Sequence, residues 1–303
     1  MRSKTRFKAS LRRAGTASLV LLSLLSWQRA GEPAWAQATP PAKGVVCDRA
    51  AFRLVVDVGH TADAPGARSA RGAVEYDFNL RLATLIEQKL IETGFEKTVL
   101  LVTDGPKRRS LTDRVARANG SSADLFLSIH HDSVPDSFLE KWEFEGEEHS
   151  FSDRFHGHSI FVSADNADFP GSLQFGRLLG SALEARGLRY TPHYTEKFMG
   201  HRQRLLIDAE AGVYRYDQLI VLKNTRMPAV LLEAGSIINR DEELQMGSPE
   251  RQSLIVAAVT DAVESFCASR RPRNPHQAAR RPGAAPAAKA ALQPAAAVSP
   301  AKR

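Results

Sequence analysis

The sequence is poor in cysteine, and its N-terminal apolar stretch is short. The two cysteines, Cys47 and Cys267, have no partner at the spacing of metal ligands, so we do not expect a cysteine metal site. The apolar stretch covers residues 14–27, fewer than the roughly 20 residues that cross a bilayer. Residues 269–303 lack aromatic residues and periodicity, so they cannot bury enough apolar surface to fold.

The first 36 residues have the composition of a secretory signal. Basic residues precede the apolar stretch, and Ala34-Trp35-Ala36 is a small-x-small cleavage site that makes Gln37 the expected mature start. No cysteine stands at this point, which argues against a lipoprotein. The Arg12-Arg13 pair leaves twin-arginine export open beside the ordinary secretory route. We therefore expect an exported, periplasmic protein in which residues 1–36 are a signal peptide and residues 37–47 a linker.

Charge is distributed unevenly along the chain. The whole chain carries +7, residues 1–36 carry +6 and residues 269–303 carry +8, which leaves −7 for residues 37–268. An acidic folded region argues against nucleic-acid binding, although the pI of the whole chain is about 9.6. We expect residues 269–303 to be a disordered, basic Pro/Ala-rich tail. This tail either contacts an anionic surface of the cell envelope or is a solvated linker.

The two cysteines lie at the two ends of the predicted folded region, residues 48–268. An exported protein meets an oxidising compartment, and the ends of a domain often lie close together. We therefore predict a Cys47–Cys267 disulfide that ties the last helix to the start of the domain. The alternative is two buried free thiols.

Residues 48–268 alternate between apolar, strand-like runs and helical patterns. We predict strands over residues 52–58, 98–103, 124–129, 159–163, 218–222 and 229–232. We predict helices over residues 75–93, 110–119, 173–186 and 249–268. This alternation indicates a single α/β domain with a mixed, mostly parallel sheet flanked by helices.

Chemically capable residues follow three of these strands directly. His60, His130 and Glu233 come at strand carboxyl ends, where parallel sheets place their chemistry, and Glu75 opens the helix after the first strand. Two imidazoles and a carboxylate are a common catalytic zinc set, and a separate carboxylate can then take the proton of a water. Spacing alone leaves this interpretation open, because a histidine after a strand is also a common loop or cap residue.

Four motifs in order carry a family resemblance. They are Asp57-Val58-Gly59-His60-Thr61, Gly72-Ala73-Val74-Glu75, residues 123–130 and residues 227–235. With Asn239 as a trailing asparagine, the chain resembles the zinc-dependent N-acetylmuramoyl-L-alanine amidases, the AmiC-like cell-wall hydrolases, over about residues 52–265. The resemblance implies an amidase/zinc-carboxypeptidase-like fold. It also implies cleavage of the amide between N-acetylmuramic acid and L-alanine of the stem peptide.

Carried over residue by residue, the resemblance implies a Zn²⁺ ion held by His60, Glu75 and His130, with Glu233 as the catalytic base. Asp132 stands where relatives often carry an acidic or polar residue, and we interpret it as orienting a metal ligand. The chain departs from the family pattern in having Val58 for proline, Thr61 for glycine and His131 for a small residue. Adjacent strand residues point to opposite sides, so one imidazole of the His130-His131 pair should face the metal, and position favours His130.

Other polar segments have two interpretations each. The acidic segment 136–157 is either a solvated surface loop or an autoinhibitory element whose glutamate occupies the open zinc position. His156 and His158 are either a metal pair or a turn and strand start. The irregular stretch 190–217 is either plain surface or a source of arginines for stem-peptide carboxylates; its candidates are His193, His201, Arg202, Arg204 and Arg215.

Two other functions compete with the amidase hypothesis. A different exported zinc hydrolase, such as a carboxypeptidase, should show a His-x-x-Glu pair, which His60-Thr61-Ala62-Asp63 does not supply. A non-catalytic wall-binding protein should have lost a ligand or Glu233, and neither is lost. No wall-binding repeat is visible, so targeting comes from a partner, the tail or the domain surface. We expect peptidoglycan as the substrate, a protein activator as a possible partner, no nucleic acid, and a monomer.

Overall fold

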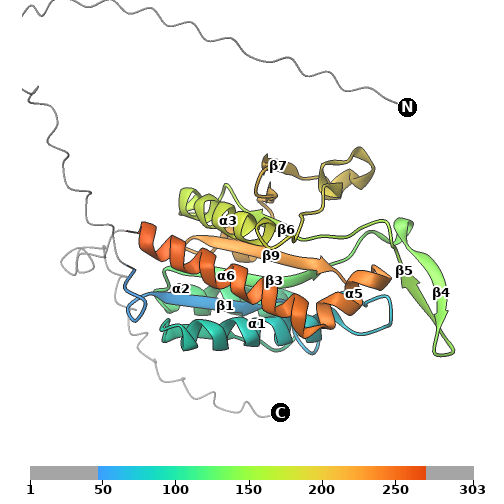
Figure 1. Cartoon of the computed structure of the whole chain (residues 1–303), viewed down its shortest axis with the longest axis horizontal. Helices are drawn as coiled ribbons and strands as arrows, with labels where there is room; N and C mark the ends of the chain where they lie inside the picture. Colours follow the sequence, from blue (N-terminus) through green and yellow to red (C-terminus); the bar gives the residue numbers. More distant parts are fainter. Residues whose placement is uncertain (1–46, 271–303) are drawn as a thin grey trace, which may run out of the picture. The chain divides into compact units, whose positions relative to one another are not determined.

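The computed structural model describes residues 47–270 (Figure 1). The predicted signal peptide, the predicted linker up to residue 46 and the predicted tail from residue 271 onward lie outside the described residues. Within residues 47–270, no helix is both long and apolar enough to span a bilayer. The predicted fold class is confirmed, because a mixed, mostly parallel sheet is covered by helices on its two faces.

Seven strands form the main sheet in the order β2-β1-β3-β9-β6-β8-β7. The first four strands in this order run parallel, β6 is antiparallel to β9, and β7 is antiparallel to β8. Because β1, β3 and β9 are parallel neighbours, their carboxyl ends share one edge of the sheet (Figure 1). The strands are β1 (Arg53–Val58), β2 (Lys97–Leu101), β3 (Leu125–Asp132), β6 (Ser159–Val162), β7 (Leu205–Asp208), β8 (Val213–Arg215) and β9 (Ala229–Ser236).

Within residues 47–270, six α-helices accompany the sheet, and alternate residues of a strand point to its two faces. Leu127 and Ile129 of β3 belong to the larger core, which contains residues of α1, α3 and α6, whereas Phe126 belongs to the core with residues of α2 and α4. Helix α6 begins as the sequence predicts, with Pro249 in its first turn and the Ser248 side chain accepting a hydrogen bond from the Arg251 N–H. The helices are α1 (Glu75–Glu92), α2 (Lys107–Gly120), α3 (Phe169–Glu184), α4 (Ile220–Lys223), α5 (Arg240–Gly247) and α6 (Pro249–Ser269).

Several predicted elements need correction. The strand predicted over residues 218–222 is wrong, because Ile220–Lys223 is the short helix α4. Val221 and Leu222 are buried in the α2/α4 core, and an apolar run of this length does not distinguish a strand from a buried helical turn. The stretch 190–217, interpreted as irregular, contributes the β7–β8 hairpin to the sheet edge. Helix α5 has no counterpart among the predicted helices, because it is short and mostly charged.

The acidic segment 136–157 contains a β-hairpin, which the sequence analysis did not predict. Strands β4 (Glu140–Phe144) and β5 (Glu147–Phe151) form a separate two-stranded sheet that projects from the main one (Figure 1). Glu145 and Gly146 form its two-residue turn, and both have positive φ, as a tight hairpin turn requires. The sequence signal was weak because nearly every second residue is a glutamate.

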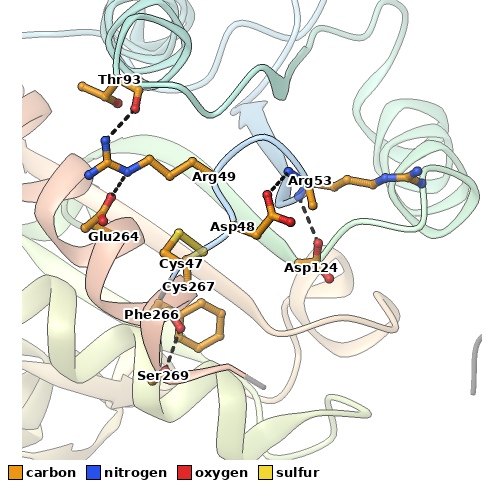
Figure 2. Close-up of a disulfide and its surroundings, with 11 residues drawn as sticks. Cys47, Asp48, Arg49, Arg53, Thr93, Asp124, Glu264, Phe266, Cys267 and Ser269 are labelled. Atoms are coloured by element: carbon orange, nitrogen blue, oxygen red, sulfur yellow. Dashed lines mark hydrogen bonds and ion pairs between the residues drawn. A yellow bond between two sulfur atoms is a disulfide. The ribbon is translucent and has the colours of Figure 1, made fainter. Parts of the chain in front are cut away.

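The two cysteines form the predicted disulfide (Figure 2). Cys267 is buried near the end of α6, and Cys47 packs against the same core. Beside it, Arg49 pairs with Glu264 at 2.7 Å and donates a hydrogen bond to the Thr93 carbonyl at 3.0 Å. The bond therefore fastens the first described residue to the last helix, and the alternative of two free thiols does not apply.

We expect a Cys47→Ser/Cys267→Ser double variant to lose about 2–5 kcal/mol of unfolding free energy, because the cross-link restricts the unfolded chain. Urea unfolding of the oxidised protein and the variant measures this difference. The reduced wild type is the control and should unfold at the midpoint of the variant. Equal midpoints for the oxidised protein and the variant would contradict the prediction.

Candidate metal and catalytic site

Two imidazoles and a carboxylate converge at the carboxyl edge of β1 and β3. His60 follows β1 after Gly59, Glu75 is the first residue of α1, and His130 lies on β3 itself. Their ligand atoms all lie within 4.8 Å of one another, and among residues 47–270 this is the one group of three that could hold a metal ion. Glu75 Oε2 is 2.9 Å from His60 Nε2, and Glu75 Oε1 is 3.0 Å from His130 Nδ1.

Two glycines leave the space that this cluster needs. A Cβ atom at Gly59 would lie 2.5 Å from the His130 ring, and one at Gly66 would lie 2.4 Å from Glu75 Oε2. Gly66 also has a φ of +84°, in the left-handed region that side chains disfavour. His60 itself has a φ of 67°, which is uncommon for a residue with a side chain. The loop between β1 and α1 is thus shaped closely around the cluster.

Glu75 is buried and ionised. Burial opposes its ionisation, but hydrogen bonds with His130 and His60 outweigh this effect and hold the pKa of Glu75 well below its usual range. The backbone N–H of Ala67 also donates to Oε2 at 3.1 Å. Burial lowers the pKa of His130, which favours the neutral imidazole that binds metals. The cluster therefore presents one negative carboxylate and an imidazole suited to ligation.

A buried arginine fixes the backbone of His60. Arg114 of α2 donates hydrogen bonds to the His60 carbonyl and, at 3.1 Å, to the Thr103 hydroxyl. It also lies 3.5 Å from Asp57 on β1. Burial raises the pKa of Asp57 to about 6, while the charge of Arg114 and a hydrogen bond from Ser128 oppose that rise. This contact could not be predicted from the sequence, because an arginine on an amphipathic helix is usually solvated.

The adjacent histidines of β3 have different surroundings. His131 is buried, its Nδ1 is 2.7 Å from Asn79 Oδ1, and its ring lies 5.5 Å from that of Phe78. Burial lowers its pKa to about 3, so it stays neutral. Asn79 also donates to Glu75 Oε1 at 3.2 Å, one helical turn earlier. The structure therefore places His130 in the cluster and connects His131 to it through Asn79, which sequence reasoning missed.

Glu233 lies on β9 directly opposite His130 in the strand register. It is partly buried, and within residues 47–270 its Oε2 atom has no hydrogen-bond partner. Burial raises the pKa of Glu233 well above its usual range, and the charges of Asp132 and Glu75 add to the rise, while Arg202 opposes it. A carboxylate in this environment accepts a proton more readily than an exposed glutamate does.

Asp132 ends β3 and is buried beside Tyr194. The tyrosine hydroxyl lies 2.8 and 2.7 Å from the two carboxylate oxygens, and the Ser133 N–H donates to the first of them at 2.7 Å. Burial raises the pKa of Asp132 to about 6. The main side-chain partner of Asp132 is therefore Tyr194, a contact that the sequence analysis did not predict. A role for Asp132 in orienting a metal ligand stays a prediction.

The remaining candidates lie apart from the cluster. No glutamate of segment 136–157 belongs to the metal-binding group among residues 47–270. The β4–β5 hairpin instead packs on the loop between His60 and Glu75, where the Trp142 indole donates to the Ala70 carbonyl at 2.8 Å. His158 is buried at the start of β6, where burial lowers its pKa to about 4.

Residues 54–265 match the N-acetylmuramoyl-L-alanine amidase family. This match covers most of the chain and nearly all of the described domain, and it includes every residue of the cluster. The chain therefore belongs to the N-acetylmuramoyl-L-alanine amidase family.

Individual proteins are similar to the chain in sequence or in fold. The chain is 26% identical over 231 residues to the uncharacterized protein YqiI of Bacillus subtilis (strain 168), covering 76% of this chain and 89% of that one. It has the fold of the N-acetylmuramoyl-L-alanine amidase from Clostridium difficile 630, with a TM-score of 0.54, 21% identity and coverage of 73% and 100% of the two chains. It likewise resembles the amidase Ami1 from Mycobacterium smegmatis, with a TM-score of 0.55, 18% identity and coverage of 73% and 99%.

Proposed function

We propose that the chain is an exported, zinc-dependent peptidoglycan hydrolase. Its reaction cleaves the amide between the lactyl group of N-acetylmuramic acid and L-alanine of the stem peptide. The observation that carries the proposal is the convergence of His60, Glu75 and His130 at a sheet edge, with Glu233 opposite His130 in the strand register. Membership of the amidase family supplies the substrate class.

The three residues fit a zinc ion by their chemistry. Two imidazole nitrogens and one carboxylate oxygen are ligands that catalytic zinc sites use, and such sites keep a further position for water or substrate. The low pKa of Glu75 and the lowered pKa of His130 mean that both are in their ligating forms at neutral pH. When bound, zinc would polarise the scissile carbonyl and make a water more acidic.

Glu233 is the proposed general base and acid. Its carboxylate accepts a proton from the attacking water and then donates it to the amine of L-alanine as the amide bond breaks. The raised pKa of Glu233 supports both steps, because it makes the carboxylate a stronger base toward the water than an ordinary glutamate. The positive charge of Arg202 opposes this rise.

The setting of the enzyme is also a proposal. Residues 1–36 have the composition of a signal peptide and support export to the periplasm, with residues 48–268 as the catalytic domain. We propose that the enzyme works as a monomer on peptidoglycan. A protein activator, contact of the basic tail with the envelope and autoinhibition through the β4–β5 hairpin all stay predictions.

Digestion of purified muropeptides with residues 37–303 tests the reaction. We expect release of free stem peptides that begin with L-alanine, detected by mass spectrometry, and loss of release in the presence of a chelator. A carboxypeptidase would instead release the last residue of the stem and leave the peptide attached to the sugar. A wall-binding protein would release nothing. Absence of free stem peptides with added zinc contradicts the proposal.

A further inference from the structure

Arg202 brings a positive charge to the buried carboxylates of the site. It ends the 3-10 segment Lys197–Arg202, and its Nη2 donates to the Ser133 carbonyl at 3.1 Å. The same Nη2 lies 3.9 Å from Asp132 Oδ1, too far for a hydrogen bond. The Arg202 side chain is 41% exposed, and the described residues offer it no other carboxylate within 4 Å. One edge of its guanidinium is therefore anchored while the group stays accessible.

Arg154 provides a second positive charge on the same side. It lies between β5 and β6, with its guanidinium carbon 4.3 Å from the ring centroid of Phe198 and 5.1 Å from that of Phe155. Among residues 47–270 it has neither an ion pair nor a side-chain hydrogen bond, and it is exposed. Stacking on aromatic rings fixes the guanidinium plane and leaves its N–H groups free for a ligand.

The two arginines share a neighbour, the His193 side chain. The Phe155 ring, beneath Arg154, lies 5.0 Å from the ring of His193. His193 Nε2 is in turn 3.9 Å from Asp132 Oδ2, the same carboxylate that Arg202 approaches. Burial lowers the pKa of His193 to about 4, and the charges of both Arg202 and Arg154 contribute to this. The charges of both accessible arginines therefore act on His193, and Arg202 also approaches Asp132.

Other arginines of the same region are already occupied. Arg215 pairs with Asp217 at 2.5 Å, and Arg240 pairs with Asp153. Arg204 lies 3.6 Å above the Tyr216 ring and donates hydrogen bonds to two backbone carbonyls. Arg202 and Arg154 differ from Arg215 and Arg240 because no carboxylate within residues 47–270 lies closer than 3.9 Å to either of them. They differ from Arg204 because neither donates hydrogen bonds to two backbone carbonyls.

We propose that Arg202 and Arg154 form a carboxylate-binding subsite for the stem peptide. Guanidinium groups bind carboxylates through paired, charge-assisted hydrogen bonds. Arg202 approaches Asp132, which stands two positions after His130 on β3, so the subsite lies beside the proposed active site. The nearest free carboxylate of a stem peptide is the α-carboxylate of the residue after L-alanine, which is joined to the next residue through its side chain. The proposal rests on the proposed function and adds selectivity for an acidic over an amidated second residue.

The test uses two synthetic N-acetylmuramoyl peptides that differ only in a free or an amidated α-carboxylate at the second residue. Binding is measured by calorimetry in the Glu233→Gln background, so that no turnover interferes. We expect Arg202→Gln and Arg154→Gln each to raise the Kd of the free-carboxylate peptide about tenfold, and that of the amidated peptide less than twofold. Lys197→Gln is the matched control, because it removes one exposed positive charge from the same segment and should change neither Kd.

The subsite and the proposed amidase function are contradicted by different results. Equal effects of the arginine substitutions on the two peptides, or no effect on either, overturn the subsite. In the otherwise wild-type enzyme, Arg154→Gln should raise the KM for the free-carboxylate peptide and leave kcat nearly unchanged, because Arg154 is not among the charges that act on Glu233. A wild-type chain that cleaves neither peptide overturns the proposed function instead, and the binding comparison then still decides whether the subsite exists. Circular dichroism of each variant shows whether its fold is retained.

Discussion

Glu233→Gln is expected to remove nearly all hydrolysis while zinc stays bound. The amide keeps the shape of the carboxyl group but cannot accept a proton from water, and loss of a general base costs about 10²–10⁴-fold in rate. Glu233 is not one of the three residues of the metal-binding group, so the zinc content should not change. Turnover of muropeptides and zinc content by mass spectrometry measure the two effects on the same preparation.

Glu143→Gln is the matched control for this substitution. Glu143 is exposed on the β4–β5 hairpin, so the same chemical change there should leave turnover and zinc content at the wild-type values. If Glu233→Gln stays within tenfold of the wild-type rate, another group takes the proton and the assignment of the base is wrong. If it loses zinc as well, Glu233 takes part in holding the metal.

His130→Ala and His131→Ala are expected to have different effects on zinc binding, because the two neighbouring histidines have different roles. Removal of His130 takes away a ligand and should abolish zinc binding, with a loss of activity of at least about 10³-fold. That loss exceeds the about 10–100-fold loss of metal affinity or activity that follows removal of a residue hydrogen-bonded to a ligand. The His131 backbone N–H donates to Glu75 Oε1 at 3.4 Å, and alanine would keep that bond. The His131 side chain contacts Glu75 through Asn79, so its removal should weaken zinc affinity within that smaller range.

Zinc titration by competition with a coloured chelator measures the affinity of each variant, and muropeptide turnover follows at saturating zinc. Excess zinc should restore much of the activity of His131→Ala and none of that of His130→Ala. The reverse pattern would mean that His131 binds the metal. Asn79→Ala is a further control, because it breaks the same connection and should resemble His131→Ala.

The position of the site at one edge of the sheet was predictable, because three of its strands can be recognised from their local sequence patterns. The residues of β1, β3 and β9 are apolar and largely β-branched or aliphatic, and His60, His130 and Glu233 come at or near their ends. Parallel pairing then brings those ends together. The structure extends β3 through Asp132 and β9 through Ser236, so His130 and Glu233 lie within paired strands instead of after them.

The supporting contacts were not predictable for a physical reason. Asn79, Arg114 and Tyr194 act through side chains that meet their partners only after the helices dock on the sheet. Tyr194 comes from a stretch with no regular pattern, and its partner Asp132 is 62 residues away. The α4 and hairpin assignments failed differently, because a four-residue apolar run and a glutamate-rich run carry little periodicity.

The Cys47–Cys267 bond joins two residues that are 220 positions apart in sequence, so it closes nearly the whole described domain into a covalent ring. A single cut by a protease anywhere between these cysteines would leave the two fragments joined. The two fragments could separate only after a reductant had broken the disulfide, and compartments outside the cytoplasm are oxidising. An enzyme exported into a compartment that contains proteases would in this way keep His60 and Glu233 on one molecule after a first cleavage.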